Sequence, residues 1–344
     1  MNKGFKLAAS FLAAATLLLS SGGGAAFAAQ KPAETAVIKI GTNRALGTIT
    51  PYLGISQGIF AKRGVTVKIV DFTDGSTLME AFASGQLDVA LLGIAPATIW
   101  QGKGVPLKVV AAANGGGHVL LTRQDTGITS VKGLRGKKVA TPKPGTVVDT
   151  LFRAHISRKV AGLDPEKDIQ IISGVAPADM PAALFVAREV DAGITWEPFA
   201  SQAEAKFKNS RVLYDAAAEW KKANPKVKNF YPTNVVIARQ SFINGRGAEL
   251  KRFLAAYVET IDFINKNPRE TNEAIAKELK LDVGIVAHAR KRIDYTASVD
   301  VPAAFETLSW SKQLGYLKEM PSESKLFDLS YLPARALSHK KGAK

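Results

Sequence analysis

Two kinds of hydrophobic pattern alternate along the chain. Short runs that are apolar throughout or at every second position predict strands, and longer segments with apolar residues three or four apart predict helices. The predicted strands are residues 36–41, 65–72, 87–92, 107–113, 118–123, 137–141, 169–172, 191–195, 211–214 and 231–239. The predicted helices are residues 49–63, 75–84, 95–101, 147–161, 179–187, 248–265, 271–279, 283–290 and 303–317. This alternation is typical of an α/β protein whose largely parallel sheets are covered by helices.

One construction occurs twice in the chain, at residues 84–97 and again at residues 187–200. Each copy contains a helix end, an Asp, a short apolar strand and then an abrupt turn with a proline. Open α/β sheets bind their ligands at strand ends of this kind. Two such ends at matching positions indicate two similar domains whose strand ends face one cleft.

The order of the elements predicts two doubly wound α/β domains that are joined by two crossover strands, with the ligand cleft between them. We expect domain I to comprise residues 36–125 and 236–335, and domain II to comprise residues 126–235. The crossings would lie near residues 123–130 and 231–240. The helices that follow Gly247 would return to domain I, and residues 336–344 would form a flexible tail.

The first 28 residues have the pattern of a secretory signal peptide. Two lysines, Lys3 and Lys6, precede an apolar run from Leu7 to Leu19, and the small-residue site Ala26–Phe27–Ala28 predicts cleavage before Ala29. An uncleaved membrane anchor is the alternative interpretation. No later segment approaches the roughly 18 uninterrupted apolar residues of a membrane span. The chain contains no cysteine, so an ordinary hydrophobic core rather than disulfides must stabilise it after export.

The charge of the chain indicates which partners it attracts. A formal net charge of +16 favours anions, whether small solutes, acidic polymers or lipid headgroups. The basic residues are scattered in short groups such as 251–252 and 291–292, which is also the pattern of a merely soluble basic surface. We expect no nucleic acid partner.

Catalytic motifs are absent from the sequence. The four histidines, His118, His155, His288 and His339, are far apart, and none has a metal-ligand partner two to four residues away. There is no G-x-S-x-G motif, cysteine nucleophile or Walker loop, and residues 115–117 lack the G-x-G-x-x-G pattern. We therefore expect no enzyme activity, no metal and no cofactor.

Four ordered segments carry a family resemblance that covers residues 37–239. They read IKIGTNRALGTITPYLGISQGIFAKRGVTVKIV, DGSTLMEAFASGQLDVALLGIAPA, SVKGLRGKKVATPKPGTVVDTLFRAHISRKVAGLDPEKDIQII and VDAGITWEPFASQAE. The chain resembles the periplasmic substrate-binding proteins of ABC importers, within the group for alkanesulfonates, taurine, nitrate and pyrimidine precursors of thiamine. The resemblance implies a type II periplasmic binding protein fold, a periplasmic monomer, a small anionic solute, and permease and ATPase partners. Fold-related enzymes that make the thiamine pyrimidine depend on a cysteine-rich segment that is absent here.

Candidate ligand-binding residues follow the predicted strands or begin the predicted helices. Helix starts offer backbone N–H groups and a dipole that favours an anion, and a Trp offers a flat apolar wall. The candidates are Asn43, Arg44, Leu46, Gly75, Ser76, Thr77, Ile94, Ala95, Asn114, His118, Gly145, Thr146, Trp196 and Glu197.

Each kind of candidate also has a structural interpretation. Ser76 and Thr146 have the pattern of ordinary helix N-caps. Arg44 could clamp an acidic group or form a surface ion pair. Residues 94–96 could form a simple turn, and Trp196 could be a core residue. His118 could be structural, and Glu197 could receive a ligand ammonium or form a salt bridge without ligand contact.

These residues predict the capture of a small organic anion, foremost an alkanesulfonate or taurine. Helix N-termini and Arg44 would hold the acidic oxygens, while Trp196 would cover the apolar tail. Nitrate has no tail for the Trp to cover, and a pyrimidine could stack on Trp196 and hydrogen-bond to Glu197. An exported enzyme and an anionic-polymer binder are the alternatives from other functional classes.

Overall fold

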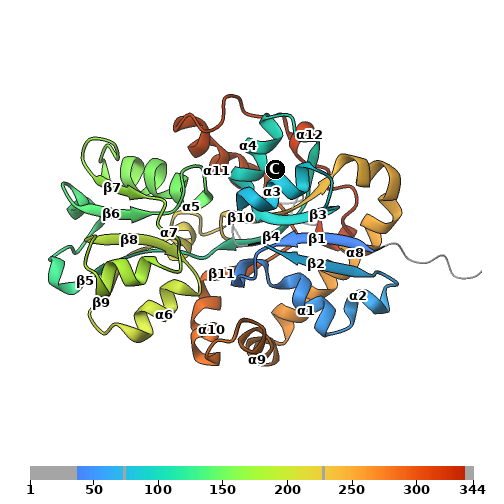
Figure 1. Cartoon of the computed structure of the whole chain (residues 1–344), viewed down its shortest axis with the longest axis horizontal. Helices are drawn as coiled ribbons and strands as arrows, with labels where there is room; N and C mark the ends of the chain where they lie inside the picture. Colours follow the sequence, from blue (N-terminus) through green and yellow to red (C-terminus); the bar gives the residue numbers. More distant parts are fainter. Residues whose placement is uncertain (1–36, 73–74, 227–228, 338–344) are drawn as a thin grey trace, which may run out of the picture. The chain divides into compact units, whose positions relative to one another are not determined.

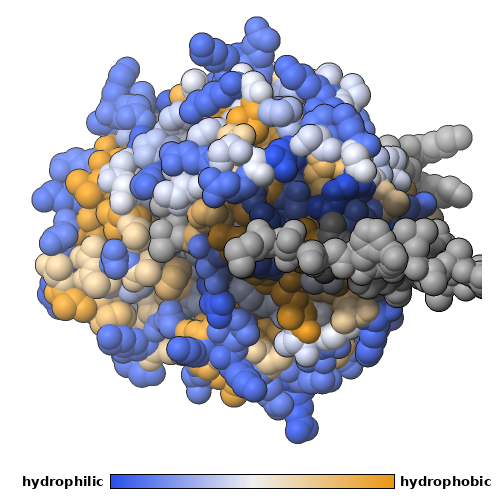
Figure 2. Space-filling view, turned by 45° about the vertical axis from the view of Figure 1, so that its right-hand side comes forward, coloured by the Kyte–Doolittle hydropathy of each residue, from blue (hydrophilic) through white to orange (hydrophobic). Residues whose placement is uncertain are grey.

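The computed structural model describes residues 37–72, 75–226 and 229–337, which belong to one compact unit. The predicted signal peptide and the tail from residue 338 lie outside the described residues, and both stay predictions. No helix in the described ranges is long and apolar enough to cross a membrane. Hydrophilic residues spread over the face shown in Figure 2, with small apolar patches between them.

Six strands form the first sheet, in the order β2-β1-β3-β10-β4-β11 (Figure 1). Their bounds are β1 Ile38–Thr42, β2 Val67–Asp71, β3 Val89–Gly93, β4 Leu107–Gly116, β10 Pro232–Arg239 and β11 Ile293–Tyr295. β1 is parallel to β2 and β3, whereas β10 is antiparallel to β3 and β4, and β11 is antiparallel to β4.

Five strands form the second sheet, in the order β7-β6-β8-β5-β9. Their bounds are β5 His118–Arg123, β6 Lys138–Thr141, β7 Gln170–Ser173, β8 Ala192–Trp196 and β9 Ser210–Asp215. β6 is parallel to β7 and β8, and β5 is antiparallel to β8 and β9. The mixed α/β class that the hydrophobic pattern predicted is therefore confirmed.

Helices cover both faces of the two sheets. Those of the first sheet are α1 Thr50–Ser56, α2 Ile59–Lys62, α3 Gly75–Ala83, α4 Ile94–Gly102, α8 Gln240–Lys266, α9 Pro268–Leu279, α10 Val283–Ala289 and α12 Glu323–Leu326. Those of the second sheet are α5 Val147–Thr150, the π-helices η4 Leu151–Ala161 and η5 Ala182–Val186, α6 Phe199–Lys206 and α7 Ala216–Ala223. A further helix, α11, spans Val301–Gln313.

Burial on both faces explains the continuous apolar runs of the strands. In β3, Val89 and Leu91 pack with α1 and α8, while Ala90 and Leu92 pack with α3 and α4 on the opposite face. The chain after Gly247 was expected to pack on the first domain. Helix α11 departs from this expectation, because it contributes to the cores of both sheets.

Three glycines decide details that the sequence pattern missed. The single helix predicted over residues 49–63 is wrong, because Gly58 adopts a φ of 67° and separates α1 from α2. Strand β4 does not end before the triple glycine but runs through Gly116. Gly116 and Gly117 have positive φ values of 73° and 92°, a conformation that favours glycine. The chain turns there into β5.

The position of the first crossing between the sheets was also predicted wrongly. β5 belongs to the second sheet, so the chain leaves the first sheet at Gly117 and not near residues 123–130. The second crossing precedes β10, which already lies in the first sheet from Pro232. The predicted domain bounds stay a prediction, and the sheet membership favours grouping residues 118–125 with the second domain.

Substitution of Gly116 tests the steric constraint at the first crossing. A Cβ at this position would lie 2.5 Å from the Arg292 carbonyl oxygen, whereas a Cβ at Gly127, with a similar φ of 69°, would meet nothing within 4 Å. We expect Gly127→Ala to lower the free energy of unfolding by about 1–2 kcal/mol. Gly116→Ala should cost about 1–3 kcal/mol more, because the backbone must move. Urea denaturation measures both, and equal losses would contradict the constraint.

Candidate ligand-binding site

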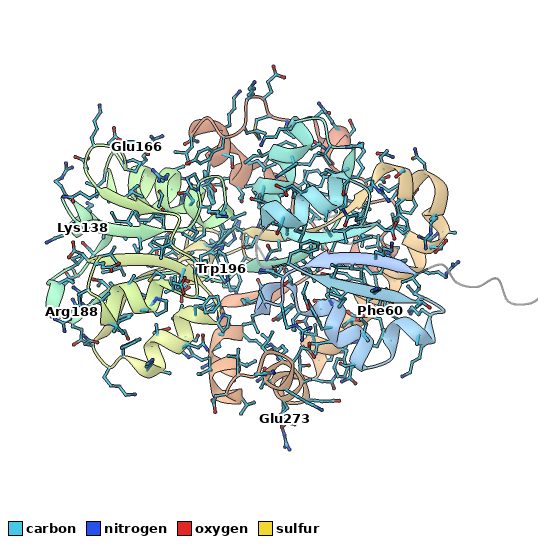
Figure 3. The ribbon with its side chains drawn as sticks, viewed as in Figure 1. Phe60, Lys138, Glu166, Arg188, Trp196 and Glu273 are labelled. Carbon is cyan, nitrogen blue, oxygen red and sulfur yellow. The ribbon has the colours of Figure 1, made fainter. Side chains whose placement is uncertain are left out.

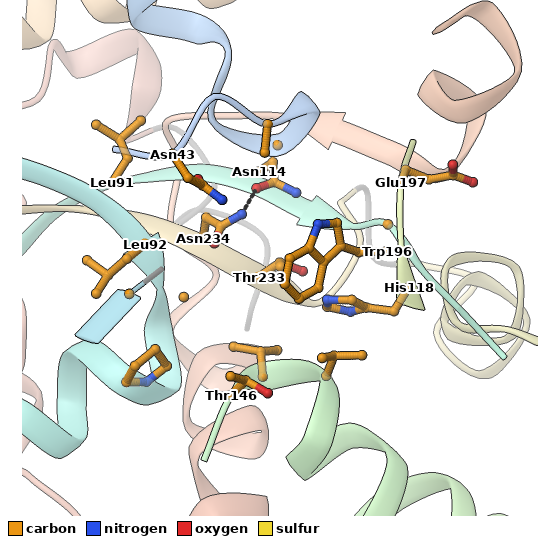
Figure 4. Close-up of a pocket in the computed structure, with 18 of the residues that line it drawn as sticks. Asn43, Leu91, Leu92, Asn114, His118, Thr146, Trp196, Glu197, Thr233 and Asn234 are labelled. Carbon is orange, nitrogen blue, oxygen red and sulfur yellow. Dashed lines mark hydrogen bonds between the residues drawn. The ribbon is translucent and has the colours of Figure 1, made fainter. Parts of the chain in front are cut away.

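A cavity of about 160 Å³ lies at strand ends of both sheets, beside the first crossing (Figure 4). Its lining combines residues from eight places along the chain. They are Asn43, Ala45, Gly47, Gly75, Leu78, Leu91, Leu92, Gly93, Pro96, Asn114, Gly116, Gly117, His118, Thr146, Val147, Val148, Trp196, Glu197, Thr233, Asn234 and Ile293. Both sheets thus contribute to one cavity, and Trp196 lies where they approach each other (Figure 3).

Three amide side chains gather at one end of the cavity (Figure 4). Asn234 of β10 donates a hydrogen bond from Nδ2 to Oδ1 of Asn114 in β4, at 2.7 Å. Asn43 follows β1, and its Oδ1 accepts a hydrogen bond from Thr48 Oγ1 at 3.0 Å. A Cβ at Gly47 would lie 2.8 Å from Asn114 Oδ1, so glycine lets this loop approach the amide pair. The cluster offers both donors and acceptors to a ligand.

His118, at the start of β5, is a buried neutral imidazole. Its Nδ1 lies 2.6 Å from the hydroxyl oxygen of Tyr231, and the two rings are stacked. Burial lowers the pKa of His118 to about 3 and raises the pKa of Tyr231 well above its ordinary value. Both groups are therefore uncharged at neutral pH, and the pair forms a fixed polar wall of the cavity.

Helix α5 reaches the cavity with its N-terminus. Thr146 caps the helix, because its Oγ1 accepts a hydrogen bond from the Asp149 N–H at 3.3 Å. The Gly145 N–H donates to Asp149 Oδ2 at 3.2 Å, so this predicted ligand donor already has an intramolecular acceptor. Thr146 faces Trp196 across the cavity in Figure 4, and the side chains of Val147 and Val148 add apolar surface.

Glu197 turns its carboxylate away from the cavity (Figure 4). Its Oε1 lies 2.7 Å from Arg292 Nη1, and its Oε2 accepts a hydrogen bond from the Ser201 N–H at 3.1 Å. Arg292 also pairs with Glu204 at 2.6 Å and Asp215 at 2.7 Å. We call these four side chains the Arg292 cluster. This geometry favours the salt-bridge interpretation of Glu197 over the binding of a ligand ammonium.

The side chains that line the cavity are almost all uncharged. Among the lining residues, only Glu197 carries a charge, and its carboxylate is paired with Arg292. His118 is neutral because of its burial. Ligand contacts in this cavity would therefore come from amides, hydroxyls, backbone groups, the helix dipole and aromatic or apolar surface.

The structure brings half of the predicted site residues together. The predicted residues that line the cavity are Asn43, Gly75, Asn114, His118, Thr146, Trp196 and Glu197. The predicted residues outside the lining are Arg44, Leu46, Ser76, Thr77, Ile94, Ala95 and Gly145.

The displaced candidates have identifiable surroundings. Arg44 is half exposed and forms ion pairs with Asp71 and Glu278, both at 2.9 Å. Leu46 is fully buried in the core, and Ser76 and Thr77 are exposed. Ile94 and Ala95 are buried in the core around α4, so Gly93 and Pro96 contact the cavity in their place.

Sequence reasoning missed the contribution of β10 and of the first turn of α5. Thr233 and Asn234 are polar residues at the start of an otherwise apolar strand, and this interruption was an available signal. Val147 and Val148 gave no such signal, because two apolar residues in the first turn of a helix are ordinary core residues. Ile293 lies on the short edge strand β11, which the hydrophobic pattern did not predict.

Removal of the central cation tests the Arg292 cluster. Arg292→Met would leave the fully buried side chain of Glu197 without a counter-charge. We expect the free energy of unfolding to fall by about 3–5 kcal/mol. The matched control is Arg63→Met, which breaks an exposed ion pair with Glu259 and should cost less than about 1 kcal/mol. Urea denaturation measures both, and similar losses would show that the cluster contributes little.

The acid sensitivity of folding tests the state of His118. Its folded-state pKa of about 3 lies below the unfolded value of about 6.5, so the unfolded chain binds more protons between these pH values. Stability therefore falls as the pH drops through this window, by up to about 1.4 kcal/mol per pH unit. We expect His118→Asn to lose this component of the slope in urea denaturation between pH 7 and pH 4. His288→Asn is the half-exposed control, and an unchanged slope in His118→Asn would contradict the assignment.

Comparisons with known proteins agree with this architecture. The chain is 30% identical over 266 residues to an Escherichia coli protein whose provisional name is aliphatic sulfonates-binding protein, covering 76% of this chain and 77% of that one. A Bacillus subtilis protein with the same provisional name is 27% identical over 261 residues, covering 75% and 74%.

Solved structures show the same fold. The periplasmic aliphatic sulphonate binding protein from Escherichia coli matches with a TM-score of 0.70 and 23% identity, covering 85% of this chain and 92% of that one. The periplasmic nitrate-binding protein from Synechocystis PCC 6803 matches with a TM-score of 0.72 and 17% identity, covering 87% of each. The predicted resemblance and the periplasmic binding protein fold are thereby confirmed. Because the model of the NMT1-like family matches residues 31–280, the chain belongs to the NMT1-like family.

Proposed function

We propose that the chain is the extracytoplasmic solute-binding component of an ABC importer. The observation that carries the proposal is one cavity lined by strand ends of both sheets and by residues of both crossings. In such an arrangement, a bound solute contacts both halves and favours the conformation in which they enclose it. The names of the relatives, which are binding proteins for aliphatic sulfonates, support the same function.

The proposed function implies a cellular location and partner proteins. The protein would act as a monomer in the periplasm after removal of its signal peptide. It would deliver its solute to a membrane permease that is driven by a cytoplasmic ATPase. The chain's own contribution is capture rather than chemistry. In the described part of the chain, no group of three or more His, Asp or Glu side chains could hold a metal ion.

The first candidate solute is a small organic anion, an alkanesulfonate or taurine. The N-termini of α3 and α5 contribute Gly75 and Thr146 to the lining, and helix dipoles favour negative charge there. Trp196 offers a face for the alkyl tail. Arg44 is not needed in this form of the proposal, since its guanidinium is paired at the surface with Asp71 and Glu278.

The second candidate is a flat heteroaromatic solute such as a pyrimidine, and the uncharged lining favours it. An anion in this cavity would lack a cationic side chain among its neighbours. A pyrimidine ring could stack on Trp196 and exchange hydrogen bonds with Asn43, Asn114 and Asn234. Glu197 has no part in this binding mode, because its carboxylate faces Arg292.

Isothermal titration with ethanesulfonate, taurine, nitrate and an aminopyrimidine tests the function and ranks the solutes. We expect at least one of the four to bind. Trp196→Ala should lower the affinity for that solute about 10- to 100-fold, because it removes a large apolar contact face. The control Trp100→Ala removes an indole of α4 that is not part of the cavity lining and should leave the affinity unchanged.

The possible outcomes separate the candidates. Tighter binding of ethanesulfonate or taurine supports the anion, and tighter binding of the aminopyrimidine supports the heteroaromatic solute. Failure of all four to bind, together with retention on heparin at physiological salt, would overturn the importer proposal in favour of an anionic-polymer binder.

A further inference from the structure

A second cavity, of about 430 Å³, lies on the second sheet's side of the molecule, outside the solute site. It is enclosed by η4, α7 and α11, together with the end of β9 and the residue that precedes β10. Its lining residues are Leu151, His155, Lys159, Val160, Tyr214, Ala216, Glu219, Trp220, Ala223, Asn224, Tyr231, Glu306 and Trp310. A volume of this size is within the range of small-molecule sites.

Five rings form a continuous wall of this cavity. The centroid distances are 6.4 Å from His155 to Tyr214 and 5.1 Å from His155 to Trp310. The wall continues from Trp310 to Tyr231 at 6.3 Å and from Tyr231 to Trp220 at 5.7 Å. We call these side chains the aromatic wall. The faces of Trp and Tyr rings attract organic cations, and the attraction strengthens where water is excluded.

His155 presents an unused hydrogen-bonding atom in the aromatic wall. Its Nε2 lies 3.2 Å from the Tyr214 hydroxyl oxygen, while its buried Nδ1 has no hydrogen-bond partner among the described residues. Burial lowers the pKa of His155, and the nearby charge of Lys159 lowers it further by a smaller amount. The ring is therefore neutral at neutral pH. With the Nε2 proton donated to Tyr214, Nδ1 is an acceptor without a protein donor. Because Nδ1 itself is buried, an N–H group in the cavity can reach it only when the His155 ring turns.

Acidic groups outnumber basic ones in the lining of the cavity. Glu219 of α7 and Glu306 of α11 are half-exposed carboxylates, and Lys159 is the one cationic lining residue. Lys159 lies 3.5 Å from Glu306, and Lys222, which is not in the lining, lies 3.8 Å from Glu219. These exposed pairs are weak, so both carboxylates can reorient towards a bound cation.

We propose that this second cavity binds a small organic ammonium ion whose apolar part packs against the aromatic wall. The His155 ring would turn so that Nδ1 accepts a hydrogen bond from the ammonium N–H, and Glu219 and Glu306 would supply the opposing charge. This second site is separate from the solute cavity. It differs from the solute cavity in charge, since its lining includes the half-exposed carboxylates of Glu219 and Glu306, whereas the one carboxylate in the lining of the solute cavity, that of Glu197, is paired with Arg292.

The four tryptophans of the chain make the location of a ligand directly visible. Trp220 and Trp310 line the second cavity, Trp196 lines the solute cavity, and Trp100 lines neither. The probe is 2-phenylethylammonium chloride, titrated into the ¹⁵N-labelled full chain. We expect the indole N–H signals of Trp220 and Trp310 to shift with a common saturation curve, while the signal of Trp100 stays in place.

Matched ligands and variants test the chemistry. The double change Glu219→Gln and Glu306→Gln should lower the affinity for the probe about 10-fold or more. The control Glu259→Gln on α8 should leave this affinity unchanged. His155→Leu should weaken the binding of the probe more than that of (2-phenylethyl)trimethylammonium, because both ligands lose the ring contact but only the probe has an N–H to donate. The alcohol 2-phenylethanol and the anion 3-phenylpropionate should bind much more weakly than the ammonium.

Three results would overturn the proposal. Equal affinities for the alcohol and the ammonium would show that the cavity binds apolar groups without recognising a cation. A shift confined to Trp196 would place the probe in the solute cavity. The absence of any shift at Trp220 and Trp310 up to millimolar probe would leave the cavity without this ligand class. The first and third results do not bear on solute capture, which the calorimetry above tests separately.

Discussion

The ion pairs of the Arg292 cluster join the two sheets beside the solute cavity, and the shape of that cavity depends on this connection. Arg292 immediately precedes β11 of the first sheet, whereas Glu197, Glu204 and Asp215 come from the second sheet and its helix α6. A guanidinium and a carboxylate that are nearly excluded from water are stable only when they stay together. The ion pairs therefore hold the end of β8 against β11, and Trp196 and Ile293 at these two places contribute to one lining.

The sequence predicted the strand ends well because local pattern determines them. Asn43 directly follows a predicted strand, Asn114 flanks the triple glycine, and Trp196 lies at the second of the two matching strand ends; all three line the cavity. The same reasoning failed for Arg44. A residue after a strand can point to either side of the sheet edge, and the carboxylates that decided its orientation, Asp71 and Glu278, are distant in the sequence.

The local sequence pattern could not predict the position of the first crossing, for a similar reason. β5 has the same apolar run whichever sheet it joins, and only its pairing with β8 and β9 assigns it to the second sheet. Lining residues from β10 and β11 depend on the same long-range pairing. The sequence thus predicts which segments end near a site, while the tertiary contacts decide which of their side chains enter it.

The hydrogen bond between His118 and Tyr231 has a consequence for the molecule as a whole. His118 lines the solute cavity and Tyr231 lines the second cavity, so one hydrogen-bonded pair of rings connects the linings of the two cavities. A shift of one ring strains or breaks the hydrogen bond to the other. If a molecule in either cavity displaces this pair, thermodynamic reciprocity requires that the two occupants change each other's affinity by the same factor.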